Sequence, residues 1–200
     1  MMAGATLVLL AILSFLLLSD PNAGSSQLPA TRFAGAIRPE SPPARFALRD
    51  QDGKLITAAG LRGQPVIVAF LYATCQNECP TIAQQIRGAL DRLGRDVPVV
   101  AVSVDPAGDT PRSAQRFLAD QQLGGRMSFL LGSDQSLQPV WQEFGIERQK
   151  DGREHTATVV LLDASGRQRI GFPLSKLTPE GVAHDVRLLQ REVAVETAAQ

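Results

Sequence analysis

The chain has 200 residues, and its 20 Lys and Arg balance its 20 Asp and Glu to give a formal net charge of zero. With 44% hydrophobic and 20% charged residues, it has the composition of a protein that buries a core, and its length allows one domain plus a targeting segment. A neutral chain with one Trp and one Tyr lacks the basic face and the stacking aromatics that nucleic-acid binding needs, so no nucleic acid is expected as a partner.

Residues 1–20 form an N-terminal hydrophobic segment that is apolar from about Met2 to Leu18. Its length is typical of a signal peptide or a short membrane anchor. No Lys or Arg precedes the apolar run and no convincing cleavage site follows it, which favours an uncleaved anchor. A cleaved signal would give a secreted protein, and a cytosolic protein with an apolar N-terminal helix is the remaining alternative.

Residues 21–41 are rich in Pro, Gly and Ser and are predicted to be a flexible linker. The folded domain is expected over residues 42–195. With the apolar segment as an anchor, this domain would lie at the cell membrane and face the periplasm or another extracytoplasmic side, where a disulfide bond can form.

Strand and helix patterns alternate through the predicted domain. The continuous apolar, β-branched runs are typical of strands that are buried on both faces of a sheet. The alternation predicts an α/β fold with a mixed central sheet flanked by helices. In chain order, we expect a hairpin over 45–61, strands over 65–72 and 97–105, helices over 80–94 and 110–124, a short strand over 127–132, a short helix over 136–145, a strand pair over 155–173 and a closing helix over 178–196.

Both cysteines lie in the stretch "YATCQNECPTI", which joins the strand over 65–72 to the helix over 80–94. This turn leaves the carboxyl end of the strand, where open α/β sheets place their functional sites. A structural disulfide between Cys75 and Cys79 is one interpretation. It is disfavoured, because closing so small a loop stabilises the fold by only about 2 kcal/mol.

A redox pair is the second interpretation, since a thiol near a helix N-terminus has a lowered pKa. Thioredoxin-like oxidoreductases, however, place two residues between their cysteines, whereas Gln76, Asn77 and Glu78 separate Cys75 from Cys79. The carboxylate of Glu78 would also oppose a thiolate beside it.

A metal site is the third interpretation. Two thiolates one helical turn apart point the same way and can share one ion. His155 begins a predicted buried strand and is expected at the same end of the sheet. Two thiolates and one imidazole form a soft ligand set that suits Cu(I), whereas structural zinc needs a fourth protein ligand. The other histidine, His184, is interpreted as an ordinary residue of the closing helix.

Three motifs, "CQNECP", "VSVDPAGDTP" and "HTATVVLLDASG", follow one another along the chain. Together, over about residues 42–192, they resemble the SCO1/SenC family of membrane-tethered, thioredoxin-fold copper proteins linked to cytochrome c oxidase assembly. The resemblance implies a thioredoxin-like fold and implies that Cys75, Cys79 and His155 are copper ligands, for Cu(I), Cu(II) or both. It also implies a cytochrome c oxidase subunit or another copper chaperone as the partner.

By the same resemblance, Asp105, Asp109 and Pro111 would shape the loop beside the site. A turn and a helix cap account for most of their chemistry, so both aspartates are left outside the site.

Thioredoxin-like enzymes keep a cis-proline opposite their cysteines, but no proline lies between Pro139 and Pro173, and His155 stands at the equivalent point. A copper metallochaperone is therefore the expected function. The alternative is a thiol-disulfide oxidoreductase that reduces cysteines in copper sites or other exported proteins, with Cys75 and Cys79 as its redox-active pair.

Overall fold

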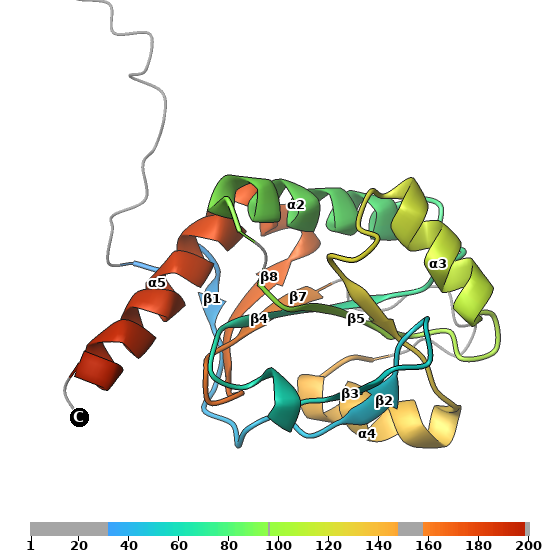
Figure 1. Ribbon diagram of the computed structural model, residues 1–200, viewed down its shortest axis with the longest axis horizontal. Coiled ribbons are helices and arrows are strands. Elements are labelled where there is room, and N and C mark those ends of the chain that lie inside the picture. The colour runs from blue at the N-terminus through green and yellow to red at the C-terminus, as the bar shows by residue number, and fades with distance from the viewer. Residues whose placement is uncertain (1–31, 96, 148–157, 199–200) are drawn as a thin grey trace, which may run out of the picture. The chain divides into compact units, whose positions relative to one another are not determined.

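The computed structural model describes residues 32–95, 97–147 and 158–198 (Figure 1). The predicted alternation of strands and helices is confirmed within these ranges. The elements are β1 (Ala36–Ile37), β2 (Ala47–Arg49), β3 (Leu55–Thr57), the 3-10 turn η1 (Ala59–Leu61), β4 (Val66–Leu71), α2 (Glu78–Leu93), β5 (Val99–Ser103), α3 (Pro111–Asp120), β6 (Ser128–Leu130), α4 (Asp134–Phe144), β7 (Thr158–Leu162), β8 (Gln168–Pro173), η2 (Leu174–Lys176) and α5 (Pro179–Ala198).

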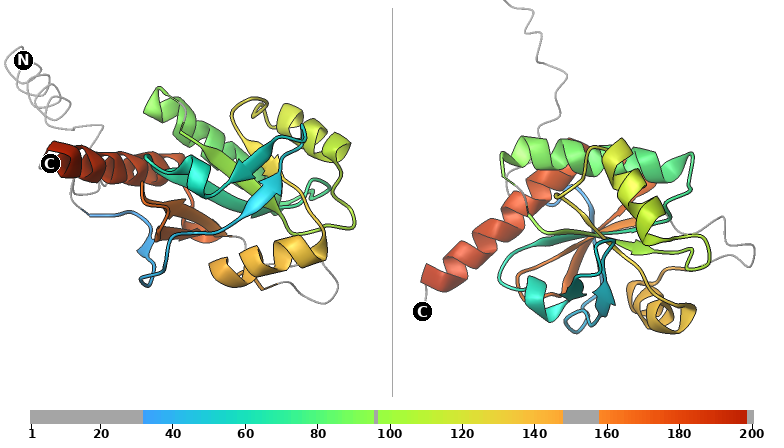
Figure 2. Two further views of the ribbon diagram at one scale, coloured as in Figure 1. Left: turned by 60° about the horizontal axis from the view of Figure 1, so that its bottom comes forward. Right: turned by 45° about the vertical axis from the view of Figure 1, so that its right-hand side comes forward.

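The central sheet is mixed, as predicted, with the strand order β1-β8-β7-β4-β5-β6. Strands β4, β5 and β6 run parallel, whereas β7 pairs antiparallel with β4, and β8 pairs antiparallel with both β7 and β1. Helices α2, α3 and α5 lie on one face of this sheet, and α4 lies on the other face together with the β2–β3 hairpin (Figures 1 and 2). The result is a three-layer α/β architecture.

Strand β4 belongs to both hydrophobic cores of the domain, and all six of its residues are buried. Ile67, Ala69 and Leu71 pack into the core shared with α2, α3 and α5. Val68 and Phe70 point the opposite way, into the core shared with α4 and the hairpin. Because side chains alternate along a strand, a run that is apolar at every position can serve both layers at once.

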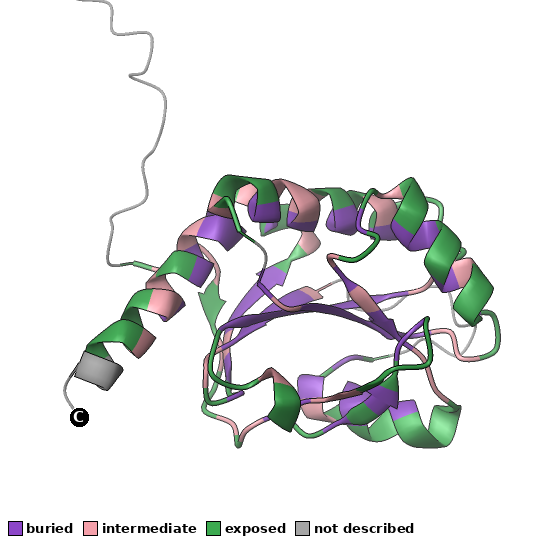
Figure 3. Ribbon diagram, viewed as in Figure 1, coloured by how far each residue is buried: buried purple, intermediate pink, exposed green. Residues whose placement is uncertain are grey.

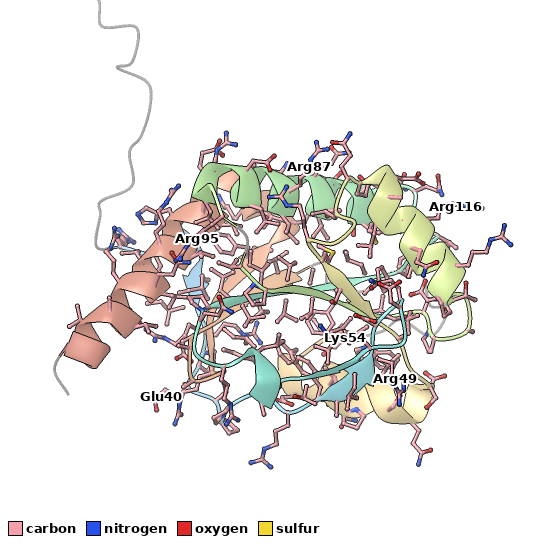
Figure 4. The ribbon with its side chains drawn as sticks, viewed as in Figure 1. Glu40, Arg49, Lys54, Arg87, Arg95 and Arg116 are labelled. Carbon is pink, nitrogen blue, oxygen red and sulfur yellow. The ribbon has the colours of Figure 1, made fainter. Side chains whose placement is uncertain are left out.

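The helices on both faces turn their buried residues toward the sheet (Figure 3). Charged side chains such as those of Arg49, Arg87 and Arg116 lie on the outside of the domain (Figure 4). Among the residues that the structure describes, no helix combines the length and the hydropathy that crossing a membrane requires.

The hairpin of β2 and β3 covers the outer edge of β6. The backbone N–H of Leu131 donates to the carbonyl oxygen of Arg49 at 2.8 Å. The N–H of Phe129 donates to the side-chain oxygen of Gln51 at 2.7 Å. Backbone groups that would otherwise be free at the sheet edge are therefore paired within the domain, which removes a site for edge-to-edge association.

The folded domain begins earlier than the sequence indicates. Strand β1 lies inside the segment predicted as a flexible linker, residues 21–41, yet it pairs with β8 in the central sheet. Just before β1, the N–H groups of Ala34 and Gly35 donate to the two carboxylate oxygens of Asp185, at 2.8 and 2.9 Å. A two-residue strand has no periodicity that a sequence pattern could reveal, because tertiary pairing alone defines it. The predicted signal or anchor, residues 1–20, lies outside the described residues.

We expect Asp185→Ala to lower the free energy of unfolding by about 2–4 kcal/mol. Asp185 is fully buried on α5, and it accepts hydrogen bonds from Ala34, Gly35 and the ring of His184. Its loss would leave two backbone donors without their charged acceptor. Urea unfolding measures the change, with Asp120→Ala on the exposed side of α3 as a control that should stay within about 0.5 kcal/mol of the parent. Equal stabilities for both variants would contradict the assigned role of Asp185.

Candidate metal and redox site

The two cysteines lie at the junction between β4 and α2. Cys75 stands in the turn before the helix, and Cys79 lies in the first turn of α2, so the helix starts earlier than the predicted residue 80. Both thiols are free and both residues are buried, with relative exposures of 8% for Cys75 and 0% for Cys79. The structure therefore brings both expected sulfur atoms together at the carboxyl end of β4.

The sulfur of Cys75 acts as a cap for helix α2. Asn77 occupies the usual capping position, but its side chain makes no capping hydrogen bond. Instead, the backbone N–H of Cys79 donates to Cys75 Sγ at 3.2 Å. The N–H of Cys75 in turn donates to the carbonyl oxygen of Tyr72 at 3.2 Å, which closes the turn. The first N–H groups of a helix have no partner within the helix, so an electron-rich sulfur is stabilised there.

The environment makes the two thiols unequal. A hydrogen bond from the Cys79 side chain is the largest influence on the pKa of Cys75, and it lowers that pKa. Burial acts in the opposite direction. Further hydrogen bonds lower the pKa again, and they come from the N–H groups of Cys79 and Asn77 and from the Tyr72 hydroxyl. The same interaction with Cys75, followed by burial, raises the pKa of Cys79. Within the pair, the thiolate form is therefore favoured at Cys75 and disfavoured at Cys79.

Tyr72 lines the site at the end of β4. Its ring packs against both hydrophobic cores. The pKa of Tyr72 is raised to about 12, mainly by burial and next by the hydrogen bond to Cys75. The hydroxyl group therefore keeps its proton near neutral pH and donates it toward the Cys75 sulfur.

Asp109, which the sequence analysis left outside the site, contacts the backbone of the cysteine turn. Its carboxylate is buried, and it accepts hydrogen bonds from the N–H of Ala73 at 2.7 Å and from the hydroxyl of Ser103 at 2.6 Å. The predicted turn and cap are present too: the N–H of Gly108 donates to Asp105 Oδ1, and Thr110 caps α3 with Pro111 at its start. The missing information was the contact with Ala73, which joins residues 36 positions apart and has no local signature.

His155, the third expected ligand, lies outside the described residues. The next strand, β7, begins at Thr158, and its Val159 pairs with Ala69 near the end of β4. Strand β7 therefore begins beside the carboxyl end of β4, where the cysteine turn also begins. Within the described ranges, no three His, Cys, Asp or Glu residues gather closely enough to hold a metal ion. His184 lies on α5, where its Nδ1 is 2.9 Å from Asp185 Oδ1.

The pH dependence of stability should report on Asp109. Burial raises the pKa of Asp109 to about 6, and the bonds from Ser103 and Ala73 offset only part of that effect. In an unfolded chain an aspartate titrates near pH 4, so between these two values the folded state binds the proton more tightly. The stabilising contribution of protonated Asp109 is therefore complete below about pH 4 and is lost as the pH rises to about 6. The loss amounts to at most about 3 kcal/mol.

Asp109→Asn should remove this dependence, because an amide does not titrate. We expect the unfolding free energies of parent and variant to diverge in favour of the variant as the pH rises from 4 to 7. Urea unfolding at a series of pH values measures the difference in unfolding free energy between parent and variant. The contributions of the other carboxyl groups are the same in both proteins and cancel in this difference. Parallel curves would show that Asp109 does not titrate in this range.

Known proteins resemble this chain in sequence and in fold. A SCO1 protein homolog from Bacillus subtilis is 30% identical over 95 residues, which cover 46% of this chain and about half, 49%, of the relative. A chloroplastic peroxiredoxin Q from Populus jackii is 30% identical over 173 residues, which cover 86% of this chain and 76% of the relative. The structure of Bradyrhizobium japonicum ScoI with copper bound is 30% identical, with a TM-score of 0.59, over 74% of this chain and 98% of that protein.

These likenesses confirm the predicted thioredoxin-like fold, with its mixed sheet and flanking helices. The sequence model of the family described as SCO1/SenC matches residues 36–190, a span that begins at β1 and ends within α5. It therefore covers the cysteine turn, the loop that holds Asp109 and the segment with His155. This chain belongs to the SCO1/SenC family.

Proposed function

We propose that this protein binds copper through Cys75, Cys79 and His155 and delivers it to a copper site of cytochrome c oxidase outside the cytoplasm. One observation carries the proposal: two free sulfur atoms meet in a single turn at the carboxyl end of β4. One of them is set up as a thiolate, which is the form that binds metal. Copper is the cargo of this site.

The donor set favours copper over other metals. Two sulfur ligands are soft and suit Cu(I), and an imidazole nitrogen adds affinity for Cu(II). His155 precedes β7 in the sequence, and Val159 of β7 pairs with Ala69 of β4, which supports His155 as the proposed third ligand. The related Bradyrhizobium protein holds copper in its structure, which supports the same cargo here.

The proposed recipient and location rest on the family and on the N-terminal sequence. The family is linked to cytochrome c oxidase assembly, so an oxidase subunit or another copper chaperone is the proposed partner. Residues 1–20 would tether the domain to the membrane on its extracytoplasmic side, and a cleaved segment would release it as a secreted protein. The residues between this segment and β1 would serve as the linker.

The reduced full-length chain, in detergent, should bind one Cu(I). Cys75→Ser or Cys79→Ser should weaken binding at least about a hundredfold, because each removes a direct ligand. Replacing a residue that only supports a ligand already lowers metal affinity about 10–100-fold. His155→Ala should weaken Cu(II) binding more than Cu(I) binding, since two thiolates alone still hold Cu(I). Competition with a chromophoric chelator measures the affinities, and His184→Ala on α5 is the matched histidine control. Unchanged affinity in either cysteine variant would refute the site.

A second candidate function, thiol-disulfide exchange, is favoured by the asymmetry of the two thiols. The Cys75 thiolate would attack a substrate disulfide to form a mixed disulfide and expel one substrate thiolate. Cys79 would then lose its proton and attack Cys75, which releases the second substrate thiol and leaves a Cys75–Cys79 disulfide. The likeness to peroxiredoxin Q, over most of both chains, supports redox use of this fold.

Alkylation kinetics test this asymmetry directly. At pH 7, iodoacetamide should modify Cys75 at least about tenfold faster than Cys79, because the thiolate is the reactive species. Mass mapping of the peptides gives the two rates, and Cys79→Ser shows how far Cys75 depends on its neighbour. His155→Ala should leave disulfide reduction largely intact. Loss of reductase turnover in that variant, with both copper affinities unchanged, would favour exchange over copper transfer as the main function.

A further inference from the structure

We infer that Asp109 is a positioning residue for the cysteine turn: its buried carboxylate fixes the backbone that presents Cys75. The inference deepens the proposed function, since it names a residue that holds the proposed ligand in place. It also applies to thiol exchange, because the same turn serves both reactions.

The carboxylate joins two segments at the carboxyl ends of the neighbouring strands β4 and β5. One oxygen accepts the N–H of Ala73, which lies in the turn between β4 and α2. The other accepts the hydroxyl of Ser103, the last residue of β5. The turn that begins at Tyr72 closes on the N–H of Cys75, so the bond to Ala73 acts inside the turn that sets the position of the sulfur.

The loop that carries Asp109 is itself held firmly. The N–H of Asp109 donates to the carbonyl oxygen of Asp105 at 2.8 Å, and the side chain of Asp105 accepts the N–H of Gly108. Directly after Asp109, Thr110 and Ser113 form a reciprocal capping box at the start of α3. Because both flanks are fixed, the carboxylate is aimed at Ala73 before any ligand arrives, as a supporting group of a precise site should be.

Ser103 extends this network to the other face of the sheet. Its carbonyl oxygen accepts the indole N–H of Trp141 at 2.9 Å, and Trp141 is a buried residue of α4. A continuous polar chain therefore runs from α4 through β5 and Asp109 to the cysteine turn. Its position in a water-poor interior makes each of its bonds costly to break.

Removing the carboxylate would leave the Ala73 N–H without this partner and would free the turn to relax. Cys75 would then lose its alignment with the N–H of Cys79, which stabilises the thiolate. A residue that contributed only to stability would change the melting temperature but would leave the chemistry of the folded site untouched. A positioning residue changes that chemistry.

The test compares Asp109→Ala, Asp109→Asn and the surface control Asp120→Ala in the full-length chain in detergent. Two readouts are taken on each folded, reduced protein: Cu(I) affinity by chelator competition, and the iodoacetamide rate at Cys75 between pH 4 and 9. We expect Asp109→Ala to weaken Cu(I) binding about tenfold or more and to move the midpoint of the Cys75 profile to higher pH. Asp109→Asn, whose amide oxygen can still accept the Ala73 N–H, should recover most of both effects.

Unchanged affinity and an unchanged profile in Asp109→Ala would overturn the inference, and so would an Asn variant that behaves like Ala. If Asp109→Ala does not fold, Ser103→Ala takes its place, since it removes the second contact of the carboxylate and should give a smaller shift in the same direction. The alkylation profile needs no copper. A parent protein that binds no Cu(I) would therefore refute the proposed function while the role of Asp109 is still decided.

Discussion

Strand β4 is the constraint on which the rest of the domain depends. It lies between β7 and β5, pairs with both, and is buried along its whole length. Only an apolar, β-branched run can fill both neighbouring cores, and such a run has no place for a polar functional group. The chemistry is therefore displaced to the first residues beyond its carboxyl end, where the chain turns into α2. The strand before the site is held in place by packing against both cores.

The start of helix α2 shows how the fold prepares a thiolate. A helix that begins without a side-chain cap has unsatisfied N–H groups and the positive end of its dipole at that point. Cys75 supplies the missing acceptor, and Cys79, one turn later, supplies both the N–H and a thiol hydrogen bond. The three residues between the cysteines matter for this reason. They place the first sulfur outside the helix, as its cap, and the second inside it.

Copper transfer and disulfide exchange make similar demands on such a site. Both need one sulfur in the thiolate form, a second sulfur in contact with it, and a rigid turn to hold them. What separates the two functions physically is the third ligand. The proposed metal site needs an imidazole as well as the two sulfur atoms, whereas an exchange enzyme needs only access for a second disulfide. The asymmetry of Cys75 and Cys79 is thus compatible with both chemistries, and the two can be distinguished by what happens when His155 is replaced.

The sequence by itself determined the order of strands and helices, the mixed sheet, the position of the cysteine turn and the cap of α3, because each rests on a local pattern. Apolar runs report burial, and Thr110 followed by Pro111 reports a helix start. Tertiary structure alone decided that β1 joins the sheet, that Gln51 covers the edge of β6, and that Asp109 reaches Ala73. These contacts join residues far apart in the chain, with separations of 78 positions for Gln51 and Phe129 and 36 for Asp109 and Ala73. Such pairings carry no periodicity, so a buried carboxylate that holds the functional turn looks, in the sequence, like any other aspartate before a helix.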